Sequence, residues 1–329
     1  MKRLFSSGPR KTELRDVEMT KITDPGQVLI KVKYNGVCMS EHYDWETGVV
    51  GQTFGHEPVG TIVEVGSAVK DYKVGDRVGG MFDGSVEYSC AEPKYIVHLP
   101  DNVSDEDAIL EPLTCLISAV SKVKIPVIGD KVAIVGCGYM GCGAISLLKK
   151  RGAYVVAVDI RPECLEFAKR YGADEVYTPD QLPEHYFDIP GKDLLFSTQG
   201  AGFKLVMEWG ETNESLDLAV RMTRQCGQLA VGAYHTGEKR AIDLQMLGAK
   251  AIDLLNTHPR EMDINIVACN NAIRMLGDGS WDFKGLPTKV YPVTQFDRAH
   301  EELKDKYGKW MKAIIDWEMT EGEPYIINN

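Results

Sequence analysis

The stretch that most constrains the fold of this chain covers residues 131–159. It opens with a short apolar run rich in β-branched residues, 131–135, and this run predicts a strand. Residues 139–150 are numerous enough for a helix, and residues 153–158 are apolar again. A strand, a glycine-rich turn, a helix and a second strand form a βαβ unit, so the stretch predicts a parallel sheet with helices on its faces.

The turn of this unit has the sequence GCGYMG at residues 136–141, a G-x-G-x-x-G motif between a strand and a helix. Gly136 would allow the tight turn, Gly138 would let a pyrophosphate approach the backbone, and Gly141 would let the helix lie close to the strand. Tyr139 and Met140 open the helix, whose N-terminus supplies positive potential for phosphates. In this context the motif predicts dinucleotide binding.

An acidic residue completes this motif. Asp159 ends the second predicted strand, 23 residues after Gly136. A carboxylate there would accept hydrogen bonds from the adenosine ribose and would repel a 2′-phosphate, so the sequence favours NAD over NADP. Ile160 and Arg161 follow directly and belong to the same predicted cofactor site. Arg161 could pair with a phosphate, which weakens the preference for NAD.

Length and charge limit the class of protein. The 329 residues suffice for two domains, each with its own core. A net charge of −11 leaves no basic face for nucleic acid, so no nucleic-acid partner is expected. No segment has the apolar length of a membrane span, and the first residues lack the apolar core of a signal peptide, so we expect a cytoplasmic protein without a membrane partner. Eight cysteines then indicate thiols or metal ligands rather than disulfides.

The pattern of short strands and helices predicts an α/β fold: a Rossmann doubly wound parallel sheet plus a mostly antiparallel β domain. The expected boundaries are a β domain over 1–121, a nucleotide-binding domain over 122–258, and a C-terminal segment over 259–329 that returns to the first domain. Expected strands cover 28–34, 60–65, 95–99, 175–177, 203–208, 228–232, 251–255 and 310–317. Expected helices cover 264–276 and 296–306, and residues 180–202 predict a loop or local hairpin.

Two segments of the first domain contain the residue types that bind zinc. Cys38 lies in the first segment, 36–46, and His56 with Glu57 in the second, 55–58. A thiolate, an imidazole and a carboxylate are zinc ligands, and a catalytic site uses three of them while keeping one position open. The segments therefore predict a catalytic zinc site if they meet in space. A third segment, with Glu111 and Cys115, is expected at the cleft before the nucleotide-binding domain.

Taken together, these features resemble the zinc-dependent medium-chain alcohol and polyol dehydrogenases, nearly from end to end. The resemblance rests on the domain order, the Gly-Val-Cys motif ending at Cys38, the Gly-His-Glu motif ending at Glu57, and the glycine-rich turn. It also rests on the Gly-Asp-Arg-Val run at 75–78 and the Glu-Pro-Leu run that starts at Glu111. The nearest branch resembles the sorbitol dehydrogenases, and the family implies a GroES-like fold for the first domain.

The resemblance implies ligands for one catalytic zinc. Cys38, His56 and Glu57 would ligate it directly or through water, and Glu111 would be a fourth protein group near the metal. Cys115 is the alternative to Glu111, because simpler alcohol dehydrogenases of the family place a cysteine ligand four residues after the matching position.

Other parts of the chain depart from the family. Most members carry a lobe with four cysteines that holds a structural zinc, and this lobe is missing here, so no structural zinc is expected and Cys90 stands alone. The family also implies a proton relay. Ser40 would accept the proton of the substrate hydroxyl and pass it through the nicotinamide ribose to His42 or Tyr43, and Glu57 would belong to the catalytic set as well as the metal set. Members often have histidine where this chain has Tyr43.

The resemblance implies an NAD-dependent oxidoreductase that transfers a hydride between NAD(H) and a secondary alcohol or ketone of a polyol, sugar or cyclitol. The alternatives are a simpler alcohol dehydrogenase or aldehyde reductase, a zinc-free quinone reductase, and a non-catalytic NAD(H)-binding redox sensor. The partner would be a small molecule, and the chain would assemble as a homodimer or homotetramer.

Overall fold

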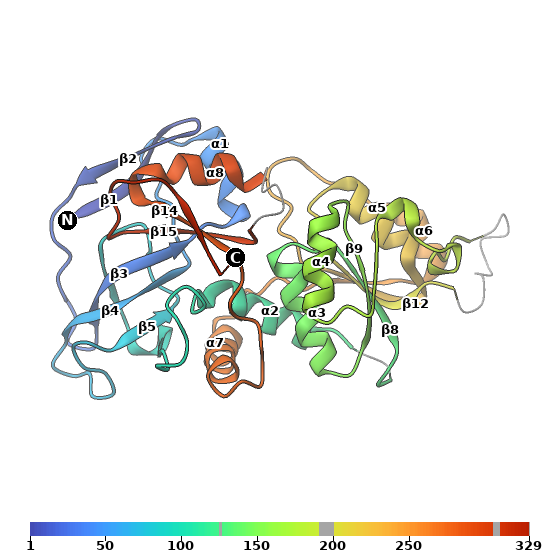
Figure 1. Ribbon diagram of the computed structural model, residues 1–329, viewed down its shortest axis with the longest axis horizontal. Helices are drawn as coiled ribbons and strands as arrows, with labels where there is room; N and C mark the ends of the chain where they lie inside the picture. Colours follow the sequence, from blue (N-terminus) through green and yellow to red (C-terminus); the bar gives the residue numbers. More distant parts are fainter. Residues whose placement is uncertain (125–126, 191–200, 305–309, 329) are drawn as a thin grey trace. The chain divides into compact units, whose positions relative to one another are not determined.

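The computed structural model describes residues 1–124, 127–190, 201–304 and 310–328, and the chain forms two compact units (Figure 1). Unit 1 combines Met1–Thr114 with Asp263–Asn329, and unit 2 covers Cys115–Met262. The sequence places the corresponding boundaries after residues 121 and 258. The division after Thr114 falls inside helix α2 (Leu110–Lys122), and the division after Met262 falls at the first residue of α7 (Met262–Gly277).

Unit 2 contains one six-stranded sheet in which every strand pair is parallel. Its strand order is β10-β9-β8-β11-β12-β13, so the order reverses between β8 and β11. This is the doubly wound Rossmann arrangement that the sequence predicts. The strands are β8 (Lys131–Val135), β9 (Tyr154–Val158), β10 (Glu175–Tyr177), β11 (Phe203–Glu208), β12 (Thr223–Val231) and β13 (Asp253–Asn256).

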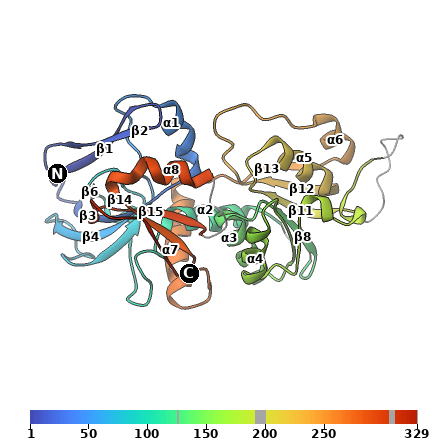
Figure 2. The same ribbon diagram turned by 45° about the horizontal axis from the view of Figure 1, so that its top comes forward.

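Helices cover both faces of this sheet. Figure 2 shows α3 and α4 on one face and α5 and α6 on the other. The apolar sides of α5, α6 and the strands form one buried cluster that includes Val135, Val158, Val206 and Leu229. The capping box of Thr212 and Ser215 fixes the start of α5. The helices are α3 (Tyr139–Lys150), α4 (Pro162–Arg170), α5 (Asn213–Met222) and α6 (Leu244–Lys250).

Two details of unit 2 differ from the expectation. Strand β12 begins at Thr223, five residues before the predicted start, because residues 224–227 form a bulge opposite Phe203 and Leu205. The predicted loop over residues 180–202 contains two short 3-10 turns, η3 (Pro179–Gln181) and η4 (Glu184–Tyr186), while its residues 191–200 lie outside the described part of the chain.

Unit 1 contains a mixed, mostly antiparallel sheet in the order β16-β14-β15-β3-β4-β5-β7, with β6 also paired to β3. The C-terminal strands β14, β15 and β16 thus join the same sheet as the N-terminal strand β3. Strands β1 and β2 form a separate hairpin. The strands are β1 (Lys2–Gly8), β2 (Lys11–Asp16), β3 (Val28–Gly36), β4 (Pro58–Val65), β5 (Arg77–Gly80), β6 (Tyr88–Ala91), β7 (Ile96–His98), β14 (Thr288–Pro292), β15 (Lys312–Asp316) and β16 (Tyr325–Ile327).

Helices α1 and α8 lie beside each other in unit 1, as both views of the ribbon show (Figures 1 and 2). Aromatic rings pack between the two helices. Three of them belong to one core cluster, Trp45, Phe54 and Phe296, and the ring of His300 contacts all three. Residues 305–306 of the predicted second C-terminal helix lie outside the described residues. No helix in the described ranges has the length and apolar character that crossing a bilayer requires. The remaining elements are α1 (His42–Thr47), α8 (Phe296–Lys304), η1 (Met39–Glu41), η2 (Pro93–Tyr95) and η5 (Val293–Gln295).

Candidate metal centre and dinucleotide site

The pairing of β3 with β4 brings the two predicted metal-binding segments together. The strands are antiparallel, so the end of β3 lies beside the start of β4, and Asn35 is opposite Pro58. Cys38 follows the end of β3, and His56 and Glu57 directly precede β4. The backbone N–H of Gly36 donates to the carbonyl of Glu57 at 2.9 Å and closes the pair at this end.

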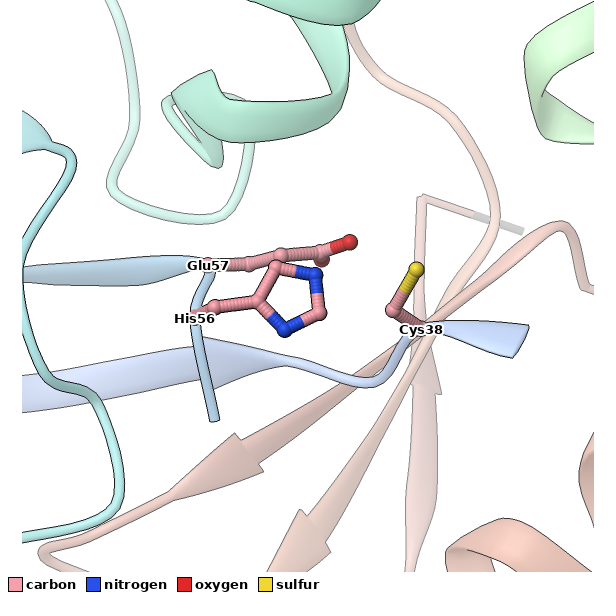
Figure 3. A group of neighbouring side chains, drawn as sticks. All are labelled: Cys38, His56 and Glu57. Atoms are coloured by element: carbon pink, nitrogen blue, oxygen red, sulfur yellow. The ribbon is translucent and has the colours of Figure 1, made fainter. Parts of the chain in front are cut away.

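Cys38, His56 and Glu57 form a compact group of donor atoms. One ligand atom from each residue lies within 4.8 Å of the others. Figure 3 shows the imidazole and the carboxylate side by side, with a ring nitrogen of His56 turned toward the sulfur of Cys38. Ligands at zinc's usual bond lengths are separated by roughly 3.5 Å, so small rotations of these side chains would suffice to bind the ion.

A second carboxylate orients the histidine. Oε1 of Glu41 lies 2.8 Å from Nδ1 of His56 and accepts the backbone N–H of Gly55, also at 2.8 Å. In the neutral imidazole of His56, a hydrogen on Nδ1 leaves Nε2 unprotonated, and this is the form that ligates a metal. Ser40 lies at the same centre, because its hydroxyl donates to the sulfur of Cys38 at 3.2 Å.

The carboxylate of Glu57 is buried against a lysine. The side chains of Glu57 and Lys312 are 1% and 8% exposed, and the two groups form an ion pair. Burial would lower the pKa of Lys312, but the charges of Glu57 and Cys38 raise it above its usual value. Gly36 permits this arrangement, because a Cβ at this position would overlap Oε2 of Glu57 at 1.8 Å.

Lys312 lies against the metal group through its ion pair with Glu57, and no sequence motif indicates it. The sequence pattern around Lys312 predicts only a strand. A lysine in the mostly apolar run of residues 310–315 is the available signal, because a lysine buried in a sheet requires a counter-ion.

The pKa shifts of Cys38 and His56 and the unpaired oxygen of Glu57 fit a site that binds a cation. Burial raises the pKa of the Cys38 thiol, and the nearby charge of Glu57 raises it further. Burial would lower the pKa of His56, but its hydrogen bonds to Cys38 and Glu41 outweigh burial and raise that pKa to about 12. Oε1 of Glu57 is buried and has no hydrogen-bond partner among the described residues. A divalent cation would replace the protons, so this donor set fits zinc.

The remaining predicted site residues, Glu111, Cys115, His42 and Tyr43, are not members of this group of donor atoms. Glu111 and Cys115 lie one turn apart on α2, and neither belongs to the described residues whose ligand atoms come within 4.8 Å. His42 is buried on α1, where its ring packs against Trp45 and burial lowers its pKa. Tyr43 is 43% exposed.

Unit 2 holds the predicted dinucleotide turn. Gly136 has a φ of +93°, a left-handed conformation, and a Cβ there would lie 2.7 Å from the backbone nitrogen of Gly210. A Cβ on Gly141 would meet the carbonyl oxygen of Gly136 at 1.9 Å, so this glycine lets α3 pack onto the turn. A Cβ on Gly138 would meet only the end of the Arg161 side chain, with Nη2 at 3.8 Å, so this position has the room that the approach of a pyrophosphate requires. The turn therefore fits a dinucleotide, with the N-terminus of α3 at Tyr139.

Asp159, the acidic residue of the predicted cofactor site, accepts hydrogen bonds from neighbouring residues. Oδ2 of Asp159 accepts the backbone N–H of Cys137 at 2.7 Å, and the side chain of Asp159 is 3% exposed. Arg161 forms an ion pair with the same carboxylate, while Ile160 between them is 78% exposed.

Two family models match this chain. The alcohol dehydrogenase GroES-like domain matches residues 24–101, and the zinc-binding dehydrogenase model matches residues 140–265. D-xylulose reductase A of Aspergillus oryzae is 26% identical over 353 residues, which cover 94% of each chain.

Solved structures show the same fold. The 2R,3R-butanediol dehydrogenase of Bacillus subtilis superposes with a TM-score of 0.76 at 23% identity, over 96% of this chain and 99% of that one. The L-idonate 5-dehydrogenase of Escherichia coli gives a TM-score of 0.77 at 20% identity, over 96% and 98% of the two chains.

The chain therefore belongs to the zinc-dependent medium-chain alcohol and polyol dehydrogenases. It is an oxidoreductase of that class, and the predicted GroES-like and Rossmann folds are both confirmed.

Proposed function

We propose that this enzyme interconverts a secondary alcohol of a polyol or sugar and the corresponding ketone, with NAD(H) and one zinc ion. The observation that carries the proposal is the Cys38, His56 and Glu57 group, whose donor atoms lie within 4.8 Å in a chain that also contains a dinucleotide turn. The relatives named above support the substrate class. D-xylulose, L-idonate and 2,3-butanediol each carry a ketone or secondary alcohol beside another hydroxyl.

Cys38, His56 and Glu57 would hold the zinc, with Glu111 as the proposed fourth group near it and Cys115 as its alternative. Zinc at such a site lowers the pKa of a hydroxyl, and a nicotinamide dinucleotide accepts a hydride. Glu41 would keep His56 in its ligating tautomer through the 2.8 Å contact at Nδ1.

Ser40 is the proposed acceptor of the substrate proton. Its hydroxyl lies 3.2 Å from the sulfur of Cys38, so it borders the metal group and would hold the proton at Oγ. Of the two residues proposed to pass the proton on, Tyr43 is exposed to water and His42 is buried against Trp45. Tyr43 is therefore the better candidate for the outer end of the relay, and His42 fits a packing role.

The cofactor would bind in unit 2 at Gly136, Gly138 and Gly141, with Tyr139 and Met140 at the start of α3. Asp159, Ile160 and Arg161 would surround the adenosine ribose. We also propose a homodimer or homotetramer in the cytoplasm. The eight free cysteines support a reducing compartment.

Zinc content and turnover test this function together. Protein purified without chelator or immobilised nickel should contain about one zinc per chain by elemental analysis, and it should reduce NAD with members of a polyol panel. Cys38→Ser should lose both zinc and activity. The matched control Cys90→Ser should keep both, because Cys90 is far from the metal group in the sheet and bonds only weakly to the carbonyl of Lys21.

Two results would contradict the proposal. Turnover in protein without zinc would favour a zinc-free reductase, and tight NADH binding without turnover of any alcohol would favour a redox sensor.

A further inference from the structure

Unit 2 holds a group of cationic and aromatic side chains at the carboxyl ends of β12 and β13, which we call the edge cluster: Lys122, Tyr234, His258 and Arg260. Tyr234 follows β12 and His258 follows β13, and the two strands are parallel neighbours. The rings of Tyr234 and His258 lie 4.9 Å apart, and the guanidinium carbon of Arg260 lies 5.4 Å from the centre of the Tyr234 ring. Nζ of Lys122 donates to the carbonyl of His258 at 3.1 Å.

The two cations of the edge cluster lack an acidic counter-ion. Among the described residues no carboxylate forms an ion pair with Lys122 or Arg260, although the chain has 48 acidic and only 37 basic side chains. Burial lowers the pKa of His258, and the positive charges of Arg260 and Lys122 lower it further. The positive potential that opposes a proton on His258 would favour an anion at the same place.

The edge cluster also has hydrogen-bonding capacity that the protein does not use. Nδ1 of His258 is buried and has no hydrogen-bond partner within the described ranges, and an unpaired buried polar atom costs free energy unless a ligand or water satisfies it. Arg260 is exposed, so its donors can reach a ligand. A guanidinium is the side chain that binds a phosphate or a carboxylate in a bidentate manner.

A buried pair fixes the backbone next to Tyr234. Nε2 of His235 lies 2.9 Å from Oε2 of Glu208, whose side chain is fully buried, and His235 has a left-handed φ of +51°. The other oxygen of Glu208 accepts the backbone N–H of Gly210 at 2.7 Å, so one carboxylate joins the segments that follow β11 and β12. The position of Tyr234 is therefore set before any ligand binds.

The edge cluster does not coincide with the expected position of the cofactor pyrophosphate. The glycine-rich turn follows β8, and β12 and β13 are the second and third strands from β8 in the sheet. With neighbouring strands about 4.8 Å apart, the edge cluster lies roughly 10 to 15 Å from the turn. A dinucleotide crosses a doubly wound sheet from one half to the other, so its nicotinamide, and the substrate beside it, would lie toward β12.

We propose that the edge cluster is a subsite for an anionic group of the substrate, so that the enzyme acts on a sugar alcohol with a phosphate or a carboxylate in preference to a neutral polyol. The inference rests on the proposed function, because it specifies the substrate of the same dehydrogenase. Arg260 would bind the oxyanion directly, His258 and Tyr234 would border it, and Lys122 would add positive charge.

Matched pairs of substrates test this subsite. Initial rates of NAD reduction are compared for galactitol and galactitol 1-phosphate, and for L-iditol and L-idonate, so that the members of each pair differ in the charged group. In one pair or both, the wild type should have a kcat/KM about tenfold or more higher for the anionic member, the effect of one charge-assisted bidentate contact. The two pairs also show whether the subsite prefers phosphate or carboxylate.

Variants of Arg260 show whether this preference comes from the edge cluster. Arg260→Ala should raise the KM of the anionic member by about tenfold and leave the KM of the neutral member and the dissociation constant of NADH unchanged, whereas Arg260→Lys should keep part of the preference. Higher ionic strength should reduce the preference in the wild type. Arg170→Ala is the control, since it removes an exposed arginine of unit 2 that lies over Tyr171 in a similar way.

The outcomes separate this inference from the proposed function. A merely structural role for Arg260 would change the rates for neutral and anionic members equally. Equal or lower kcat/KM for the anionic members of both pairs, or a preference that survives Arg260→Ala, would overturn the subsite while neutral polyols are still oxidised. Turnover of no member would instead overturn the proposed function, and this inference with it.

Discussion

Nδ1 of His56 lies 2.8 Å from Oε1 of Glu41, and this contact joins the two halves of the metal group. Glu41 follows Cys38 in the segment after β3, whereas His56 precedes β4. The same Oε1 accepts the backbone N–H of Gly55, so one carboxylate oxygen fixes both the ring and the backbone beside it. Glu41 therefore determines which nitrogen of His56 is free to ligate a metal.

Loss of Glu41 should weaken zinc binding without removing a ligand. Glu41→Ala is expected to lower zinc affinity by about 10- to 100-fold, the usual effect of losing a carboxylate that orients a ligating histidine. Competition with a chromogenic chelator measures the change. Glu46→Ala is the control, since Glu46 lies on α1 and makes only a 3.7 Å ion pair with Lys304. Equal zinc affinity in the wild type and Glu41→Ala would show that the tautomer of His56 does not depend on Glu41.

The buried pair of Lys312 and Glu57 should stabilise the fold mainly by avoiding an unpaired charge. Lys312→Met leaves the carboxylate of Glu57 buried without its partner, and we expect the zinc-free protein to lose about 3 to 5 kcal/mol of unfolding free energy. The double variant with Glu57→Gln should recover most of that loss. Urea unfolding of the wild type, the two single variants and the double variant measures the coupling between Lys312 and Glu57. Additive effects of the two substitutions would refute this coupling.

The two sites differed in how far the sequence could predict them. The dinucleotide turn was predictable in detail, because the left-handed φ of Gly136 and the close approach of Gly141 to its carbonyl arise within one short βαβ unit. The metal group required two segments to meet, and only the residue types, with the family resemblance, indicated that Cys38 and His56 would do so. The register of β3 against β4 places them, and register depends on the whole buried sheet.

Sequence patterns could not predict which side chains bind each other in the folded chain. Lys312 reaches Glu57 because β15 pairs with β3, and no local pattern specifies which strand a C-terminal segment will join. Similarly, the spacing of Asp159 and Arg161 suggested two separate functions, a ribose acceptor and a phosphate partner. The structure shows that the two side chains bind each other.

Close packing at the glycine-rich turn should be intolerant of a methyl group. Gly141→Ala would place a Cβ 1.9 Å from the carbonyl oxygen of Gly136, so α3 must shift away from the turn. NADH affinity should fall by at least about tenfold, because the backbone donors at the helix N-terminus move with the helix. Gly248→Ala on α6 is the control, because a Cβ there meets no described atom within 4 Å. It should leave NADH binding unchanged and stabilise the helix by up to about 1 kcal/mol. Unchanged NADH affinity in Gly141→Ala would contradict the role of this close approach.

His300 should make unit 1 sensitive to mild acid. The side chain is fully buried on α8 between the rings of Trp45, Phe54 and Phe296, and neither ring nitrogen has a hydrogen-bond partner among the described residues. Burial, with a smaller effect of His42, lowers its pKa to about 3. Near the rings, Arg10 stacks on Trp45, and Asp297 accepts its indole N–H at 2.8 Å.

The sign of the pH dependence follows from that lowered pKa. Above about pH 6.5 the imidazole is neutral in both the folded and unfolded states, so it adds no pH dependence. Between pH 6.5 and about 3 the unfolded chain binds a proton that the folded chain excludes, so stability falls as the pH falls, by up to about 1.4 kcal/mol per pH unit. His300→Phe keeps an aromatic ring in the cluster and removes this titration. Relative to the wild type, it should therefore lose about 2 kcal/mol less between pH 7 and pH 5. Urea unfolding at several pH values measures the difference, with His185→Asn, an exposed histidine of unit 2, as the control. Parallel pH profiles for the wild type and His300→Phe would show that His300 is not the acid-sensitive group.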